Sequence, residues 1–321
     1  MEHSLRHGLT RIHRFSAAAV ASSAVLIATA AAAPAQAASA PAVTAKGAIV
    51  FDSTALSGKG KTLYGKTADT KRQMASTTKL MTAVVVLGEK NLSLTKKVTV
   101  KQAYRDYVAK NGASNADLKT GDKLTVGQLL YAMLLPSGCD AAMALADTYG
   151  TGTTIAARTK SFIKQMNAKA VSLKMTNTTY DSFDGISTSS KNLSTPRDMA
   201  KLAVKGMSYT TLRTVVKAKS SVQKATASNG HTRTYTWTNT NTLLGSYSGA
   251  VGIKTGTGSV AGPCMIFAAT RSGRTIIVVL LHSSSVSTRF KEAAKLADWA
   301  FGTSTSSSLK LRTLPSGMQQ D

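Results

Sequence analysis

The chain has 321 residues, of which 43% are hydrophobic and 17% charged, with 40 Lys and Arg residues against 15 Asp and Glu residues. This composition is typical of a folded globular protein and excludes a disordered chain, a collagen and a disulfide scaffold. No stretch after residue 40 approaches the ~20 uninterrupted apolar residues that a membrane span needs, so the body of the chain is not an integral membrane domain.

The N-terminus has the pattern of a secretory signal peptide. Three arginines precede an Ala-rich run over residues 15–33, and small residues with the pattern Ala-x-Ala follow at Ala35–Ala37. A basic start, an apolar centre and a small-residue cleavage site define such a signal. We therefore predict a signal peptide over residues 1–40, with a retained membrane anchor as the alternative. The protein is expected to be exported, and to be extracellular or associated with the cell wall or the outer face of the membrane.

The positive charge bears on possible partners. Cleavage after Ala37 removes three Arg and one Glu and leaves a formal net charge of +23. This charge favours contact with anionic cell-wall polymers, and a solvated Lys-rich surface is the alternative. Nucleic acid is not an expected partner, because the basic residues are spread singly and aromatic residues make up only 6% of the chain. We expect a monomer.

A single domain is predicted over residues 41–302, followed by a Ser/Thr-rich, disordered tail over residues 303–321. The first elements are a hairpin formed by Ala48–Asp52 and Thr62–Lys66. From Ser76 onward, apolar residues recur at the spacing of a helix.

The next predicted helix has clear start and stop signals. Thr125 and Gln128 form a capping box, and Pro136 ends the helix, so Ser137 is placed on a loop. Two further helices are expected over residues 140–148 and 155–173.

The C-terminal part of the domain is rich in strands. Gly249–Gly256 is predicted as one strand, and Cys264–Thr270 and Thr275–His282 as a hairpin. Thr288–Phe301 is predicted as a closing helix. Strands at both ends of the chain, with helices between them, indicate an α+β fold in which helices cover one antiparallel sheet.

Several chemistries are disfavoured. A Ser-His-Asp triad is disfavoured because the sequence contains no G-x-S-x-G elbow. In addition, His231 and His282 are the only histidines that remain after cleavage of the signal. A P-loop match over Gly60–Thr67 contains bulky residues and is not followed by a helical pattern. We expect no metal and no cofactor, because Cys139 and Cys264 stand alone in the sequence.

The remaining candidate is a serine activated by a lysine. Ser76 and Lys79 form an S-x-x-K motif at the start of an apolar helix, so their side chains lie on one face within hydrogen-bonding reach. A serine hydroxyl needs an adjacent base at neutral pH, and a lysine in apolar surroundings can act as that base. This motif alone is weak, because S-x-x-K also occurs by chance on many helices.

Two later motifs add to its weight. Ser137-Gly138-Cys139 follows the helix that ends at Pro136, and Lys254-Thr255-Gly256 ends a predicted strand. In this order the three motifs resemble those of the penicillin-recognising serine enzymes. Further segments resemble the low-molecular-mass D-alanyl-D-alanine carboxypeptidases: 124–138, Met166-Asn167, Asp184-Gly185, 194–199 and Asn239-Thr240-Asn241.

The resemblance covers about Lys46 to Phe301 and implies a β-lactamase/transpeptidase-like fold with a mostly helical subdomain. It implies a peptidoglycan stem peptide ending in D-Ala-D-Ala as the substrate and β-lactams as inhibitors. By the same resemblance, Ser76 attacks the carbonyl of the penultimate D-Ala, Lys79 takes its proton, and Ser137 relays a proton towards the leaving nitrogen.

The resemblance also implies a substrate-binding set. Lys254 and Thr255 would hold the terminal carboxylate, with Gly256 beside them. The backbone N–H groups of Ser76 and Thr257 would form the oxyanion hole.

The middle motif departs from the family's usual Ser-x-Asn, because Cys139 takes the place of Asn. This resembles a small exported D,D-transpeptidase branch that carries Ser-Gly-Cys. A thiol is a weak donor, so orientation of the bound peptide would depend more on the backbone. The alternative is that Cys139 is a small buried residue tolerated at this position.

The sequence disfavours two other function classes. A class A β-lactamase needs a carboxylate, usually Glu, to activate the deacylating water, and the chain has no Glu between Glu89 and Glu292. A non-catalytic wall-binding module of the same fold would not need Ser76 and Lys79. The sequence leaves open whether water or an amine accepts the acyl group.

Overall fold

The computed structural model describes residues 39–54, 60–187, 189–316 and 318. The predicted signal peptide therefore lies outside the described residues, except for its last two positions. From Ser39 onward the described residues form one compact unit. No helix in this part of the chain is long and apolar enough to cross a membrane.

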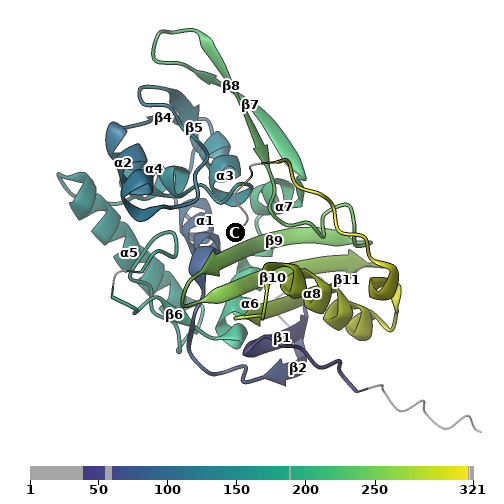
Figure 1. Ribbon diagram of the computed structural model, residues 1–321. Coiled ribbons are helices and arrows are strands. Elements are labelled where there is room, and N and C mark those ends of the chain that lie inside the picture. Colours follow the sequence, from purple (N-terminus) through teal and green to yellow (C-terminus); the bar gives the residue numbers. More distant parts are fainter. Residues whose placement is uncertain (1–38, 55–59, 188, 317, 319–321) are drawn as a thin grey trace, which may run out of the picture. The chain divides into compact units, whose positions relative to one another are not determined.

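The largest sheet has five antiparallel strands contributed by both ends of the domain (Figure 1). In spatial order these are β2 (Lys61–Lys66), β1 (Gly47–Asp52), β11 (Arg274–Leu281), β10 (Gly262–Arg271) and β9 (Ala250–Gly258). The apolar, β-branched run of β11 is buried along almost its whole length, as expected for a central strand covered on both faces. Both predicted hairpins are confirmed. β9 is an edge strand.

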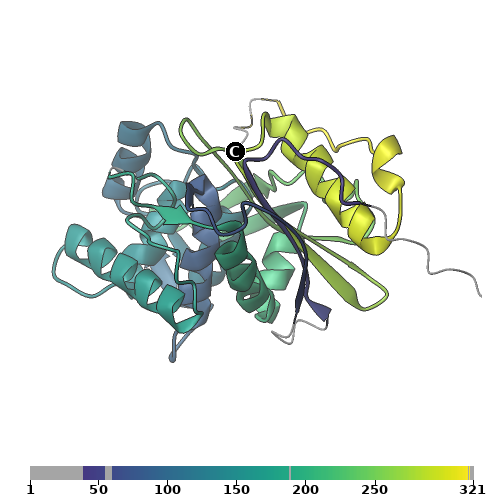
Figure 2. The same cartoon turned by 90° about the horizontal axis from the view of Figure 1, so that it is seen from below.

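Helices cover both faces of this sheet. Alternate residues of the strands belong to two separate apolar clusters, one shared with α8 (Val286–Phe301) and one shared with α1 (Lys79–Leu87) and α6 (Pro196–Met207). Figure 2 shows α8, in yellow, on one side of the sheet and the blue and teal helices on the other. The predicted α+β class is therefore confirmed.

The middle of the chain builds the helical part. Its remaining helices are α2 (Gln102–Asn111), α3 (Val126–Leu134), α4 (Cys139–Tyr149), α5 (Ile155–Ser172) and α7 (Thr210–Lys217). Every residue of α1 is buried, because its sequence is apolar on all sides and the other helices surround it. The capping box of Thr125 and Gln128 is present, and α3 ends before Pro136 as predicted.

Two small sheets were not predicted. One has the order β4 (Lys97–Thr99), β5 (Lys123–Thr125), β7 (Ser220–Thr226) and β8 (Thr232–Thr238), and the other pairs β3 (Arg72–Gln73) with β6 (Leu193–Ser194). Along β7 and β8, exposed residues alternate with partly or fully buried ones, which is the period of a half-buried strand.

The tail differs from its prediction. Residues 303–316 are described, and Thr305–Ser308 form a 3-10 helix, so the expected disorder is wrong for this stretch. The buried carboxylate of Asp298 accepts hydrogen bonds from the hydroxyl groups of Thr303 and Thr305 and from the backbone N–H of Ser306. These bonds tie a Ser/Thr-rich segment to the end of α8, which composition alone does not predict.

Candidate active site

Ser76 and Lys79 meet at the start of α1. Ser76 lies in a 3-10 turn, Ala75–Thr78, that leads directly into α1, so it precedes the α-helix instead of lying in its first turn. The Nζ atom of Lys79 donates a hydrogen bond to Ser76 Oγ over 2.8 Å and another to the carbonyl oxygen of Asp184 over 3.2 Å. A neutral amine in this place can take the proton of the serine.

The loop before α4 carries Ser137 and Cys139. Ser137 has a positive φ of 67° and is fully buried, and its Oγ has no hydrogen-bond partner among the described residues. Ser114 holds this loop: its Oγ donates to the carbonyl oxygen of Ser137 over 2.8 Å, and its own carbonyl oxygen accepts the N–H of Cys139. A strained loop held from outside is common at functional sites.

β9 carries the third motif. Lys254 Nζ donates to the carbonyl oxygen of Thr255 over 2.8 Å, and both side chains are buried. A Cβ atom at position 256 would lie 2.7 Å from Ser76 N and 2.8 Å from Thr77 N. Gly256 therefore lets the edge strand approach the backbone of the serine more closely than any other residue could.

Ser76 opens into a cavity of about 510 Å³. Of the eight predicted site residues, Ser76, Cys139 and Thr257 line this cavity, and the other five are not among its lining residues. The remaining lining comes from three segments, Asn111–Ser114, Gly185–Ser187 and Gly258–Ala261, together with Gln73, Ala75 and Ser190. No charged side chain is among the lining residues.

Sequence reasoning missed Arg289. This buried residue of α8 donates through Nη1 to the carbonyl oxygen of Gly256 and to Thr257 Oγ1, both over 2.9 Å. Its positive charge therefore stands directly behind the strand that carries Thr255. No local pattern singles it out, because it is one of 40 basic residues and lies more than 30 positions from its partners.

The role of Asp184 was also missed, although the pair Asp184-Gly185 had been noted. Its carbonyl oxygen accepts a hydrogen bond from Lys79, and its Oδ2 accepts one from Tyr107 over 2.9 Å. Burial, followed by the charge of Asp184, raises the pKa of Tyr107 far above its usual value. The phenol therefore stays protonated and holds the carboxylate in place.

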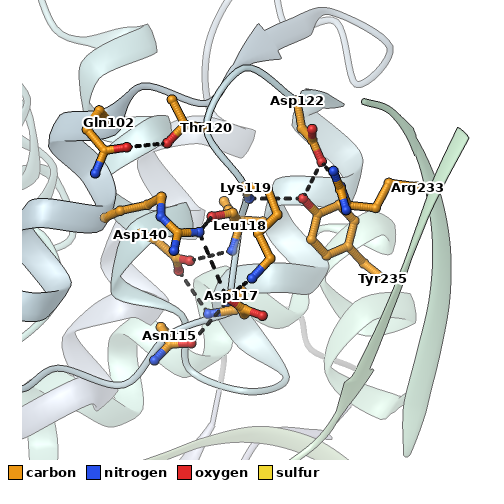
Figure 3. Close-up of polar contacts among 12 residues, drawn as sticks. Gln102, Asn115, Asp117, Leu118, Lys119, Thr120, Asp122, Asp140, Arg233 and Tyr235 are labelled. Carbon is orange, nitrogen blue, oxygen red and sulfur yellow. Dashed lines mark hydrogen bonds and ion pairs between the residues drawn. The ribbon is translucent and has the colours of Figure 1, made fainter. Parts of the chain in front are cut away.

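A buried carboxylate anchors the wall that faces Ser76. Figure 3 shows Asp140 beside the loop that contains Asn115, Asp117 and Leu118. Its carboxylate accepts the backbone N–H groups of residues 116, 118 and 141. The pKa of Asp140 is raised overall, because the effect of burial exceeds the lowering effect of these hydrogen bonds. The same loop continues back to Ser114, so this network fixes part of the cavity wall.

Among the described residues, no group of three or more His, Cys, Asp or Glu side chains could hold a metal ion. Cys139 and Cys264 are both buried, and neither forms a disulfide bond.

A serine, a buried amine in contact with it, and a close edge strand are the parts of a serine acyl-transfer enzyme. The chain matches the D-alanyl-D-alanine carboxypeptidase family, peptidase family S11, over residues 34–285. It belongs to this family. The resemblance stated from the three motifs is thereby confirmed, and the chain is assigned to the serine peptidases, not to the β-lactamases.

Individual relatives agree with this assignment. The D-alanyl-D-alanine carboxypeptidase of Streptomyces sp. strain K15 is 53% identical over 237 residues, which is 74% of this chain and 81% of that protein. DacC of Escherichia coli is 35% identical over 73% of this chain and 56% of its own length. The crystal structure of the Streptomyces K15 DD-transpeptidase matches with a TM-score of 0.80 and 52% identity, covering 83% of this chain and 100% of that one.

Proposed function

We propose that this protein is a serine-type D-Ala-D-Ala carboxypeptidase or transpeptidase that acts on peptidoglycan stem peptides through an acyl-enzyme at Ser76. The observation that carries the proposal is the 2.8 Å contact between Lys79 Nζ and Ser76 Oγ at the edge of a cavity. Family membership and the close Streptomyces relative support the substrate class.

In the acylation step, Ser76 Oγ attacks the carbonyl carbon of the penultimate D-Ala while Lys79 takes the hydroxyl proton. The negative charge on the carbonyl oxygen is stabilised by the backbone N–H groups of Ser76 and Thr257, both of which lie at the cavity. The amide C–N bond then breaks. The terminal D-Ala leaves after its nitrogen gains a proton through Ser137, and the peptide remains as an ester on Ser76.

Binding of the terminal carboxylate is assigned to Lys254 and Thr255, with Arg289 as a second positive charge behind the strand. These residues are nearly inaccessible to solvent, so charge interactions there are stronger than at the surface. Gly256 is required for close approach to Ser76, and Cys139 lines the cavity opposite β9.

The ester can pass to water, which gives carboxypeptidase activity, or to an amine, which gives transpeptidase activity. Neither Glu89 nor Glu292 lines the cavity, and Glu292 accepts hydrogen bonds from the backbone of Thr44 and the hydroxyl of Ser283. Among the described residues, no glutamate is therefore placed to activate water against a bound penicillin. We expect the penicilloyl ester to be long-lived.

The test is incubation of the mature protein with labelled penicillin, followed by mapping of the adduct, with Ser76→Ala as the control. A stable adduct on Ser76 supports the proposal. Rapid turnover of the drug, or full labelling of the Ala variant, would contradict it. Incubation with a D-Ala-D-Ala peptide, with and without an amine acceptor, then separates hydrolysis from transpeptidation by the masses of the products.

The wider setting is also a proposal. The N-terminal pattern supports export to the extracellular space or the cell wall, and a net charge of +23 after cleavage supports attraction to anionic wall polymers. We propose that the enzyme acts as a monomer. Salt-dependent sedimentation with wall fragments tests the attraction, and equilibrium centrifugation tests the monomer.

A further inference from the structure

Thr240 contacts one of the three motifs directly and the segment that leads into a second. It follows β8, is buried, and places its Oγ1 2.6 Å from the Oγ1 of Thr255 on β9. Its backbone N–H donates to the carbonyl oxygen of Leu135, two residues before Ser137. Its side chain therefore touches the carboxylate-binding strand, and its backbone touches the segment that leads into the Ser-Gly-Cys loop.

Binding of a carboxylate to Thr255 would fix the direction of the hydrogen bond between the Thr240 and Thr255 hydroxyl groups. Each hydroxyl has one proton to donate and can accept through its oxygen. A substrate carboxylate is an acceptor only, so Thr255 must give its proton to the carboxylate when the peptide binds. The 2.6 Å contact can then persist only if Thr240 is the donor. When Thr240 donates to Thr255, the hydroxyl proton of Thr255 is available for a hydrogen bond to the substrate carboxylate.

The segment that carries Thr240 is held on two sides. The side-chain amide of Asn239 donates to the carbonyl oxygens of Val216 and Ala218 at the end of α7. On another side, the Nη2 atom of Arg312 donates to the carbonyl oxygen of Asn239 over 2.6 Å and to that of Asn241 over 3.3 Å. Thr240 lies between these two carbonyl groups.

Arg312 belongs to the C-terminal segment, beyond the part of the chain that matches the family. Figure 1 shows this segment, in yellow, turning back after α8 and running towards α7. The bonds to Asp298 hold its start, and Arg312 holds its far end against the segment of Thr240. The segment from Thr303 to Arg312, called the strap below, therefore connects the end of α8 with the segment that carries Thr240.

We propose that Thr240 is a positioning residue that orients the Thr255 hydroxyl towards the terminal carboxylate of the substrate, and that Arg312 braces the segment that carries Thr240. This inference rests on the function proposed above. Neither residue touches the reacting atoms, so both act through Thr255. The predicted effect is therefore on recognition of the carboxylate more than on acylation in general.

The first experiment compares two peptides that differ only at the C-terminus: one ends in D-Ala-D-Ala with a free carboxylate, and the other carries a terminal amide. The measured quantity is kcat/KM for the carboxylate peptide divided by kcat/KM for the amide peptide. Thr240→Val should reduce this ratio by about tenfold, mainly by raising KM for the carboxylate peptide, because a single hydrogen bond is lost. Thr240→Ser should restore most of the ratio. In a Thr255→Val background, Thr240→Val should have little further effect.

The matched control is Thr275→Val. It removes a similar hydroxyl pair, the buried Thr275 with the partly buried Thr270 at 2.9 Å, where β10 and β11 meet at their hairpin. The ratio should not change in this variant. An equal loss for both peptides in Thr240→Val, or fully additive effects with Thr255→Val, would overturn the positioning role.

The second experiment replaces Arg312 by Ala and by Lys, with melting temperatures measured in parallel. Arg312→Ala should lower the same ratio about threefold, because it removes some of the hydrogen bonds that hold the segment of Thr240 and leaves those of Asn239 in place. Arg312→Lys should recover part of the ratio. An unchanged ratio in a folded Arg312→Ala variant would overturn the role of the strap. Absence of a penicillin adduct on Ser76 in the wild-type protein is a different result, which would overturn the proposed function itself.

Discussion

Replacement of Gly256 by Ala tests how the site depends on the approach of β9 to the nucleophile. The added Cβ atom would lie 2.7 Å from Ser76 N and 2.8 Å from Thr77 N. Both are backbone atoms of a buried turn, so they cannot rotate away as the end of a side chain would. The two backbones must separate by about 0.7 Å to reach an ordinary contact of 3.4 Å.

This separation is large compared with what the oxyanion hole tolerates. Oxyanion donors act over about 2.7 to 3.1 Å. Of the two donors proposed here, one is on Ser76, and the other, Thr257, follows Gly256 directly on β9. A shift of 0.7 Å carries one donor out of reach. Loss of one such donor lowers the rate by about 10² to 10³, so we expect that decrease in the rate of acylation by a fluorescent penicillin, measured by stopped flow.

Gly258→Ala is the matched control on the same strand, because its Cβ would meet only the Cβ atoms of Ala261 and Ala75, at 3.6 and 3.7 Å. It should acylate within about threefold of the wild-type rate. Thermal melting establishes that both variants are folded. Acylation of a folded Gly256→Ala variant at the wild-type rate, or an equal defect in Gly258→Ala, would refute the reasoning.

Three further predictions follow from individual groups. Lys79→Ala should lower acylation of Ser76 by about 10² to 10⁴ while penicillin still binds, and a decrease below tenfold would indicate another base. Burial raises the pKa of Cys264 to about 11, so a thiol reagent at pH 8 should label Cys139, which lines the cavity, before Cys264, and prior acylation should protect Cys139; equal labelling rates would contradict this. Asp147 is a buried residue of α4. Burial raises its pKa, but hydrogen bonds from Lys101, Tyr104 and Arg158 outweigh burial and lower the pKa overall. Its contribution to stability is therefore present above pH ~4 and lost as the pH falls through the folded pKa, so Asp147→Asn should lower the Tm by about 5 °C at pH 7 and by less at pH 3.

Local signals in the sequence predicted the parts of the site that depend on neighbours in the chain. The spacing of Ser76 and Lys79 is three residues, and the capping box that starts α3 has the same spacing, so one turn of helix determines both geometries. Pro136 likewise ends α3 and leaves Ser137 on a loop for a local reason.

Contacts between distant segments could not be predicted in this way. Arg289 and Thr240 reach β9 from α8 and from the loop after β8, and no periodic pattern marks either residue. The short strands β4 and β5 have three residues each, which is too few for an alternating pattern to stand out. The tail was misjudged because composition does not record that Asp298 supplies acceptors for its hydroxyl and N–H groups.

The position of the nucleophile follows from two close backbone approaches. Gly256 on β9 faces the N–H of Ser76, and a Cβ at Gly185 would lie 2.1 Å from the carbonyl oxygen of Ala75 and 2.9 Å from Ser76 N. Ala75 itself has a positive φ of 47°, which an L-residue adopts only when its surroundings impose it. The turn is therefore held between a strand and a loop that are far apart in sequence. Because this arrangement exists before substrate binds, the oxyanion donors need little reorganisation during the reaction.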